Sequence, residues 1–201
     1  MLLMLLLEGG LMKQAKVLND KEMERVLKII STKKHAQRNR LIFFLSFYAG
    51  MRACEIANIR VFDVIDKEGY IQDVAYLTAD QVKGKESQCV YLSEKVKKEI
   101  QKYVREVHFR GFTENTKLIK SQRGGGFNSA TIQQVFRVLY EEAGITNASS
   151  HSGRRHFITN LSDKGVSTRV IQELARHKSL VTTQKYIDVS SDKLLNAVGI
   201  L

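Results

Sequence analysis

Proline is absent from this 201-residue chain, and cysteine occurs only at Cys54 and Cys89. Because proline usually makes up about 5% of a protein, loops that lack it must turn on glycine, asparagine and aspartate. The two cysteines have neither the spacing of paired metal ligands nor the number needed for a disulfide framework. We therefore expect both thiols to be reduced and structural.

Long apolar runs are also missing. No run reaches the roughly 18 apolar residues that indicate a membrane-spanning helix. Residues 1–7 are apolar, but this stretch is short and lacks the basic region that begins a signal peptide. We expect a cytoplasmic protein without a membrane partner, in which residues 1–14 form a disordered or peripheral leader.

Acidic residues are outnumbered by basic ones. The chain has 32 Lys and Arg against 21 Asp and Glu, which gives a net charge of +11. Such an excess favours a polyanionic partner, and nucleic acid fits, although an anionic membrane would fit on charge alone. The triple glycine at 124–126 lacks the Gly-Lys-Ser/Thr ending of a nucleotide-binding loop, and no His-Glu-x-x-His occurs. We expect no cofactor and no metal.

The hydrophobic pattern predicts one α+β domain that is mainly α-helical, with a small three-stranded antiparallel sheet. Apolar stripes and capping residues predict helices at 21–30, 39–49, 94–107 and 129–143, with caps at Asn19-Asp20 and Asn128-Ser129 for the first and last of these. Ser167, after a break at Gly165, can cap a further helix. Short β-branched and aromatic runs predict strands at 60–64, 70–77 and 88–92.

The last third of the chain carries several side chains that can bind a phosphate or react with it. His151 and Arg154 stand three residues apart, which on a helix would place both on one face. His177 and Tyr186 follow, and Arg52 lies far upstream. Two guanidiniums can grip phosphate oxygens, two imidazoles can move protons near neutral pH, and a phenol can attack phosphorus. These groups together suggest DNA strand transfer.

The same residues resemble a known family. His151-x-x-Arg154, Ala175-Arg176-His177 and Thr182-Thr183-x-x-Tyr186 resemble the C-terminal boxes of the tyrosine recombinases, or phage integrases. Those boxes read His-x-x-Arg, Leu-Gly-His and Thr-Thr-x-x-Tyr. Gly50-x-Arg52-x-x-Glu55 resembles the family's first arginine box. The resemblance covers residues 15–201 and implies the catalytic domain of a site-specific recombinase, which joins DNA strands through a 3′-phosphotyrosine without ATP or metal.

The resemblance also implies roles for individual residues. Tyr186 would attack the scissile phosphate, while Arg52, Arg154 and His177 would stabilise the developing negative charge. His151 would take the tyrosine proton or support the group that does.

Two further residues have implied roles upstream. Glu55 lies one helical turn from Arg52 and would orient it. A lysine between the second and third predicted strands would protonate the leaving 5′ oxygen. Lys83 matches the family pattern, and Lys85 remains the alternative if the hairpin register slips.

The chain departs from the family pattern at two positions. Arg176 replaces the usual glycine before the second histidine, and Gly153 replaces a leucine in the first helical turn. A catalytically inactive DNA-binding fragment therefore remains an alternative, and a type IB topoisomerase is another. A glycine in that turn costs about 1 kcal/mol relative to alanine, and a side chain at position 176 requires an ordinary backbone there.

The resemblance finally implies how the domain would work with its partners. The short leader leaves no room for the family's separate N-terminal DNA-binding domain, so we expect a catalytic domain alone, either excised from a longer integrase or naturally short. Double-stranded DNA is the expected partner. The apolar residues of the tail, 191–201, suit a helix that packs on a neighbouring subunit in a homo-oligomer, expected to be a tetramer on DNA.

Overall fold

The computed structural model describes residues 14–82, 84, 86–107, 113–121, 125–187, 194–195 and 198–199. Its elements run in the order α1 (Asp20–Ser31), α2 (Ala36–Tyr48), α3 (Ala53–Asn58), the 3₁₀ turn η1 (Val61–Asp63), β1 (Val74–Leu77), β2 (Gln88–Tyr91), α4 (Glu94–Val107), α5 (Ser129–Glu142), α6 (Ser152–Asp163), α7 (Thr168–Ala175) and α8 (Leu180–Gln184). The predicted class, mainly helical with a small antiparallel sheet, is confirmed. No helix in the described ranges has the length and apolar character needed to cross a membrane.

Helix starts follow the capping residues read from the sequence. The Asn19 side chain accepts a hydrogen bond from the Glu22 N–H, and the Glu22 side chain accepts one from the Asn19 N–H. Together these two bonds form a capping box for α1. Asn128 caps α5 and Ser167 caps α7 in the same way, each through its side-chain oxygen. These helices begin within a residue or so of their predicted positions because a cap is a local interaction.

The sheet is smaller than predicted. Within the described residues it has two antiparallel strands, with Val74 opposite Tyr91 and Leu77 opposite Gln88. The prediction of a third strand at 60–64 is wrong, because Val61 and Val64 are both fully buried and lie three residues apart, which is the period of a helical turn. Residue 60 retains a single bridge to residue 117.

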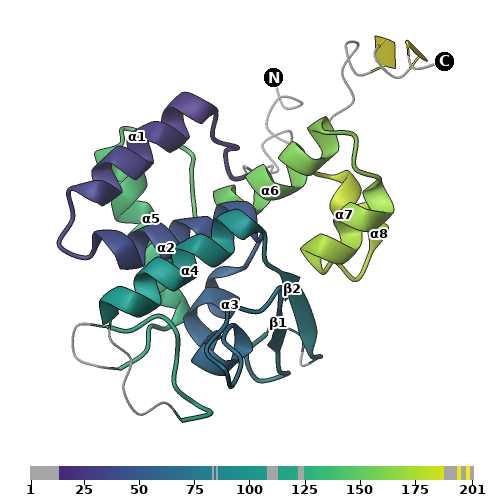
Figure 1. Ribbon diagram of the computed structural model, residues 1–201. Coiled ribbons are helices and arrows are strands. Elements are labelled where there is room, and N and C mark those ends of the chain that lie inside the picture. The colour runs from purple at the N-terminus through teal and green to yellow at the C-terminus, as the bar shows by residue number, and fades with distance from the viewer. Residues whose placement is uncertain are drawn as a thin grey trace, which may run out of the picture.

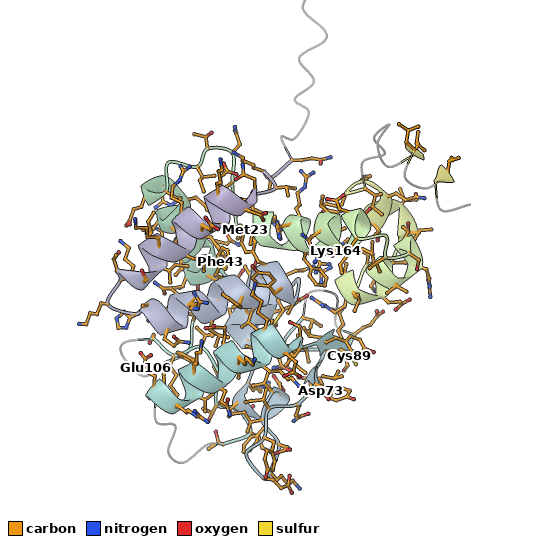
Figure 2. All side chains as sticks on the ribbon, turned by 45° about the horizontal axis from the view of Figure 1, so that its top comes forward. Met23, Phe43, Asp73, Cys89, Glu106 and Lys164 are labelled. Atoms are coloured by element: carbon orange, nitrogen blue, oxygen red, sulfur yellow. The ribbon has the colours of Figure 1, made fainter. Side chains whose placement is uncertain are left out.

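Helix α2 forms the centre of the molecule. Helices α1, α3, α4 and α6 all pack against it (Figure 1). The sequence predicted one apolar stripe on this helix, but every residue from 41 to 47 is buried. A helix that is covered on all sides has no solvent-facing stripe. Figure 2 shows Met23 of α1 and Phe43 of α2 among these packed helices, where both belong to the main hydrophobic core.

Helices α6, α7 and α8 form a smaller layer beside this core (Figure 1). Ile158, Ile171 and Ala175 pack together in a separate apolar cluster, which Tyr186 partly covers. This layer carries the C-terminal motifs and meets the rest of the molecule mainly through the contact between α2 and α6.

Gly153 makes the contact between α2 and α6 possible. A Cβ atom built at this position would lie 2.2 Å from the Ser46 hydroxyl oxygen and 2.7 Å from Cδ2 of Phe47. The intrinsic helix cost of glycine is therefore outweighed at this site, because the backbone of α6 lies where a side chain would otherwise be. The departure from the family pattern is a packing feature that sets how closely Arg154 approaches α2.

Replacing Gly153 with alanine should lower the free energy of unfolding by about 1–3 kcal/mol, because overpacking a tight contact displaces its neighbours. Urea denaturation of both proteins measures this difference. Gly125→Ala is the matched control, since its added methyl would meet only the Ser121 hydroxyl at 3.8 Å. A Gly153→Ala protein as stable as the wild type would contradict the close-approach explanation.

Candidate active site

Arg52 and Glu55 form a tight unit at the start of α3. Arg52 is the N-cap residue, and its Nη1 donates to Oε1 of Glu55 over 2.6 Å. The backbone N–H of Arg52 also donates to Oε2 of Glu55 at 2.9 Å. Because Glu55 has no exposed side-chain surface whereas 22% of the Arg52 side chain is exposed, the carboxylate anchors a guanidinium that reaches solvent.

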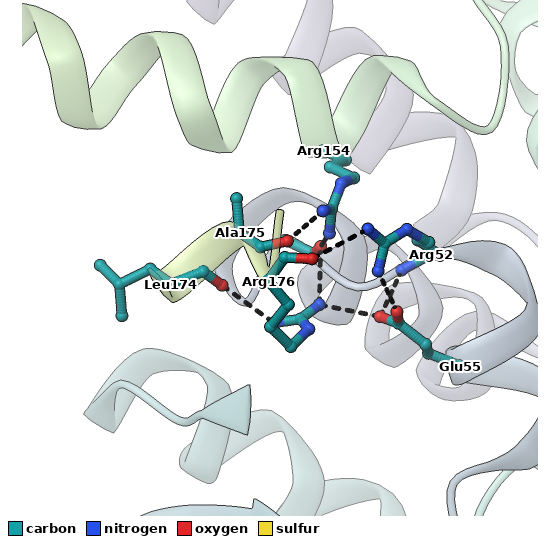
Figure 3. A network of polar contacts seen from close by, with 7 residues as sticks. Arg52, Glu55, Arg154, Leu174, Ala175 and Arg176 are labelled. Carbon is teal, nitrogen blue, oxygen red and sulfur yellow. Dashed lines mark hydrogen bonds and ion pairs between the residues drawn. The ribbon is translucent and has the colours of Figure 1, made fainter. Parts of the chain in front are cut away.

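Arg154 joins two chain segments that are far apart in sequence. It lies in the first turn of α6, and its Nη1 donates to the carbonyl oxygen of Gly50 over 2.6 Å. Its Nη2 donates to the carbonyl oxygen of Ala175 at the end of α7. Figure 3 shows the Arg154 side chain reaching toward the turn of α7 beside Arg52. Two guanidiniums thus converge from α3 and α6.

Arg176 is the third arginine of this network. Its backbone adopts the left-handed conformation, with φ 55° and ψ 47°, at the C-cap of α7. A side chain is thus accommodated here without the ordinary backbone that the sequence analysis took as its condition. Its side chain turns inward, where Nη2 donates to Oε2 of Glu55 over 2.8 Å (Figure 3). Sequence analysis treated Arg176 as a departure from a pattern and missed it as a member of the site, although the departure itself was the available signal.

His177 follows directly and is held by a threonine. Its Nδ1 lies 2.9 Å from the hydroxyl oxygen of Thr183, which is fully buried in α8. Burial, followed by repulsion from Arg154, Arg52 and Arg176, lowers the pKa of His177 to about 4. The imidazole is therefore neutral at pH 7. Thr183 was quoted in the sequence motif but was not given a role.

Tyr186 lies beside His177, two residues after α8 ends. The two rings stack with their centroids 5.7 Å apart. The guanidinium carbon of Arg155 lies 5.5 Å from the centre of the Tyr186 ring, within reach of a cation–π interaction. Arg155 also donates to the carbonyl oxygen of Ala15 over 2.8 Å. Arg155 was not among the residues predicted from the sequence, and its contact with the tyrosine ring follows only from the fold.

His151 borders two clefts of the site. It is the exposed N-cap residue of α6, whereas Arg154 is buried in the first turn of that helix. His151 lines a cleft of ≈ 320 Å³ together with Arg52. It also lines a second cleft together with Tyr186. An imidazole at this border can exchange a proton with groups on either side.

The expected lysines, Lys83 and Lys85, lie outside the described residues. Val82, next to the first of them, lines the same cleft as Arg52 and His151. Nowhere in the described part of the chain do three or more His, Cys, Asp or Glu side chains gather in an arrangement that could hold a metal ion.

The charge of Glu55 balances the cluster. Burial alone would raise the pKa of Glu55, but the guanidiniums of Arg176 and Arg52 and the backbone N–H of Arg52 outweigh it, so the pKa lies below the ordinary 4.5. Burial, together with repulsion from Arg52 and Arg176, lowers the pKa of Arg154, which still stays protonated at neutral pH. One buried carboxylate therefore faces three cationic side chains.

Replacing Glu55 with glutamine should destabilise the protein at pH 7 by about 3–5 kcal/mol, because it leaves buried guanidiniums without a counter-charge. The pKa of Glu55 is lower in the folded state, so its contribution is complete above about pH 4.5 and is lost as the pH falls through the folded value. The stability difference between the two proteins should therefore shrink in acid.

Chemical denaturation at pH 7 and below pH 4.5 tests this. Glu173→Gln is the control, since Glu173 pairs with Arg169 on an exposed helix surface. A Glu55→Gln deficit that stays constant across this pH range would exclude the charge explanation.

The chain is similar to known proteins over most of its length. The phage integrase family matches residues 16–193. Tyrosine recombinase XerA of Pyrococcus furiosus is 30% identical over 186 residues, which are 91% of this chain and 60% of that protein. The crystal structure of a XerA recombinase has a TM-score of 0.71 at 26% identity and covers 90% of this chain and 61% of its own.

A second solved structure shares the fold at lower identity. The XerH recombinase bound to its palindromic difH substrate has a TM-score of 0.69 at 22% identity, over 92% of this chain and 52% of that one. This chain thus spans about three fifths of the length of the XerA protein it matches. Because the family match extends over nearly all of its residues, the chain belongs to the phage integrase family.

Proposed function

We propose that this chain is the catalytic domain, over residues 15–201, of a site-specific DNA recombinase. The observation that carries the proposal is the convergence of Arg52, Arg154 and His177 beside Tyr186, from segments more than 100 residues apart. Such a cluster supplies cations for a phosphate and a nucleophile next to them. Double-stranded DNA is the proposed substrate, in keeping with the XerH structure, which is bound to its own DNA site.

The reaction begins with attack of the Tyr186 oxygen on phosphorus. The new bond joins that oxygen to the 3′ phosphate, the bond from phosphorus to the 5′ oxygen breaks, and a proton reaches the leaving 5′ oxygen. Lys83, or Lys85 in a shifted register, is the proposed donor of that proton, and His151 is the proposed acceptor of the tyrosine proton. The 5′ hydroxyl of a partner strand reverses the step, so neither ATP nor a metal ion is required.

Arg52 and Arg154 would bind the non-bridging phosphate oxygens. Within the described part of the chain, each donates two hydrogen bonds to protein oxygens. A guanidinium has five N–H donors, so each retains donors for a phosphate. We assign Glu55 the role of holding Arg52 in place, because its two oxygens already accept from the Arg52 side chain and backbone.

His177 would act as a hydrogen-bond donor instead of a base. Its neutral ring has one N–H, and Nδ1 faces the Thr183 hydroxyl. We assign the hydroxyl as donor to Nδ1, which places the ring proton on Nε2. Nε2 is then the atom that donates to a phosphate oxygen in the transition state.

The proposal extends to assembly and location. The tail residues Leu194, Leu195 and Val198 have between 58% and 72% of their surface exposed. We propose that the tail packs on a neighbouring copy in a tetramer on DNA. We also propose action in the cytoplasm, where the free thiols of Cys54 and Cys89 would stay reduced.

Substituting serine for Leu194, Leu195 and Val198 together should reduce assembly on DNA, because it removes the apolar surface from the interface. Light scattering of the protein bound to a duplex measures the assembled mass. The mass of each protein without DNA is measured as well, so that assembly on DNA can be told from assembly of the free chain. An unchanged mass on DNA would exclude the tail as the contact.

Changing Tyr186 to phenylalanine should abolish covalent attachment to DNA. The substrate is a pool of nicked duplexes with a randomised recognition segment, so that cleavage traps the adduct and sequencing it reports the preferred site. Wild type should give a slower protein band on a denaturing gel. Tyr70→Phe is the control, because Tyr70 is 72% exposed and belongs to none of the motifs.

The outcomes separate the candidate functions. An adduct with wild type and Tyr70→Phe, but not with Tyr186→Phe, supports the recombinase. Adducts in all three proteins would exclude Tyr186 as nucleophile. No adduct with any of them would favour the inactive DNA-binding fragment. Supercoil relaxation without exchange of partner strands would favour the topoisomerase.

A further inference from the structure

Arg176 has a backbone conformation that its residue type disfavours. Asn147 and Arg176 are the non-glycine residues with positive φ in the described part of the chain. Asparagine enters this region readily, whereas arginine does so at a cost of about 1 kcal/mol or more. Such strain persists when surrounding contacts fix the residue. The side chain of Arg176 provides those contacts.

Those contacts are buried and directed. The Arg176 side chain is 5% exposed and Glu55 is fully buried. Besides the ion pair with Glu55, Nη2 donates to the Gly50 carbonyl oxygen over 3.1 Å, and Nη1 donates to the Leu174 carbonyl oxygen over 3.0 Å. Arg176 thus ties the end of α7 to both the chain before Arg52 and the carboxylate that holds Arg52.

The two proposed phosphate-binding arginines donate hydrogen bonds to consecutive carbonyl oxygens of the turn at 175–177. Arg154 donates to the Ala175 carbonyl oxygen, and Nη2 of Arg52 donates to the Arg176 carbonyl oxygen over 3.3 Å. His177 is the next residue. Glu55 accepts Arg52 on Oε1 and Arg176 on Oε2, so the two guanidiniums share the carboxylate without displacing each other (Figure 3).

We propose that Arg176 is a positioning residue of the phosphate site, which through Glu55 fixes the turn carrying His177 against Arg52. This inference rests on the proposed function for its catalytic readout. Arg176 is assigned no DNA contact, because its charge is paired with the buried carboxylate of Glu55, whereas Arg154 donates to uncharged carbonyl oxygens. A glycine at this position would relieve the backbone strain but would remove the side-chain link from α7 to Glu55, leaving only the bond from Arg52 to the carbonyl oxygen of residue 176.

The test compares Arg176→Gly, Arg176→Lys and the control Arg137→Ala. Arg137 forms an exposed ion pair with Glu141 on the surface of α5, so its loss matches the change in charge at a distance from the 175–177 turn. Adduct formation with the nicked-duplex pool is followed in a single turnover at saturating protein, well below the melting temperature of each variant.

Arg176→Gly should slow adduct formation about 10- to 100-fold, as misplacement of a reacting group by about 1 Å does. DNA affinity should stay close to that of wild type, because Arg176 does not bind phosphate. Arg176→Lys should recover part of the rate, since an ammonium can pair with Glu55 but cannot also keep the two carbonyl bonds. In the double variant with Glu55→Gln, loss of Arg176 should add little further.

A second measurement does not depend on activity. Titration of the His177 ring by NMR in DNA-free protein should give a higher pKa in Arg176→Gly, since a nearby positive charge is removed and Glu55 is left without that partner. Arg137→Ala should leave it unchanged. If wild type forms no adduct, the proposed function fails and this titration alone decides the role of Arg176. An unchanged titration, or an unchanged rate in an active protein, overturns the inference.

Discussion

The buried carboxylate of Glu55 is the interaction on which the site depends. The guanidiniums of Arg52 and Arg176 lie close enough to lower the pKa of Arg154 by repulsion. The carboxylate of Glu55 lies among these three cations, which lower its pKa. In a medium of low dielectric constant, such a cation cluster is stable only with a counter-charge and satisfied donors. Backbone carbonyl oxygens at the ends of α2 and α7 accept further hydrogen bonds from Arg154 and Arg176. The excess positive charge that is left suits a phosphate diester.

Two close approaches place this cluster at the junction of the helical layers. Helix α2 is covered on every side, and α6 meets it where Gly153 has no side chain. At the end of α2, Gly50 adopts a positive φ, and a Cβ there would lie 2.5 Å from the ring of Phe157. Both glycines bring α6 against the segment that leads to Arg52. The packing of the core and the geometry of the phosphate site therefore have the same cause.

Much of the site was accessible from residue types and spacing. The sequence indicated Arg52, Arg154, His177 and Tyr186 because few reactions require two arginines, an imidazole and a phenol in such motifs. Spacing did not reveal that His151 is exposed at a helix cap while Arg154 is buried, nor that Arg155 covers the tyrosine ring. Those facts depend on neighbours from other parts of the chain. The lysine assignment stays a prediction, since both candidates lie outside the described residues.

The sequence by itself determined the helix starts at Asn19, Asn128 and Ser167, because a cap bonds to backbone only a few residues away. It also determined the mainly helical class and the family. Tertiary structure decided the two-stranded sheet, the burial of α2 on all faces and the inward turn of Arg176. Each of these is set by packing between segments that are distant in sequence. Burial of Val61 outweighs the strand preference of residues 60–64, the contact of Gly153 with Ser46 covers α2, and pairing with Glu55 outweighs the backbone preference of Arg176.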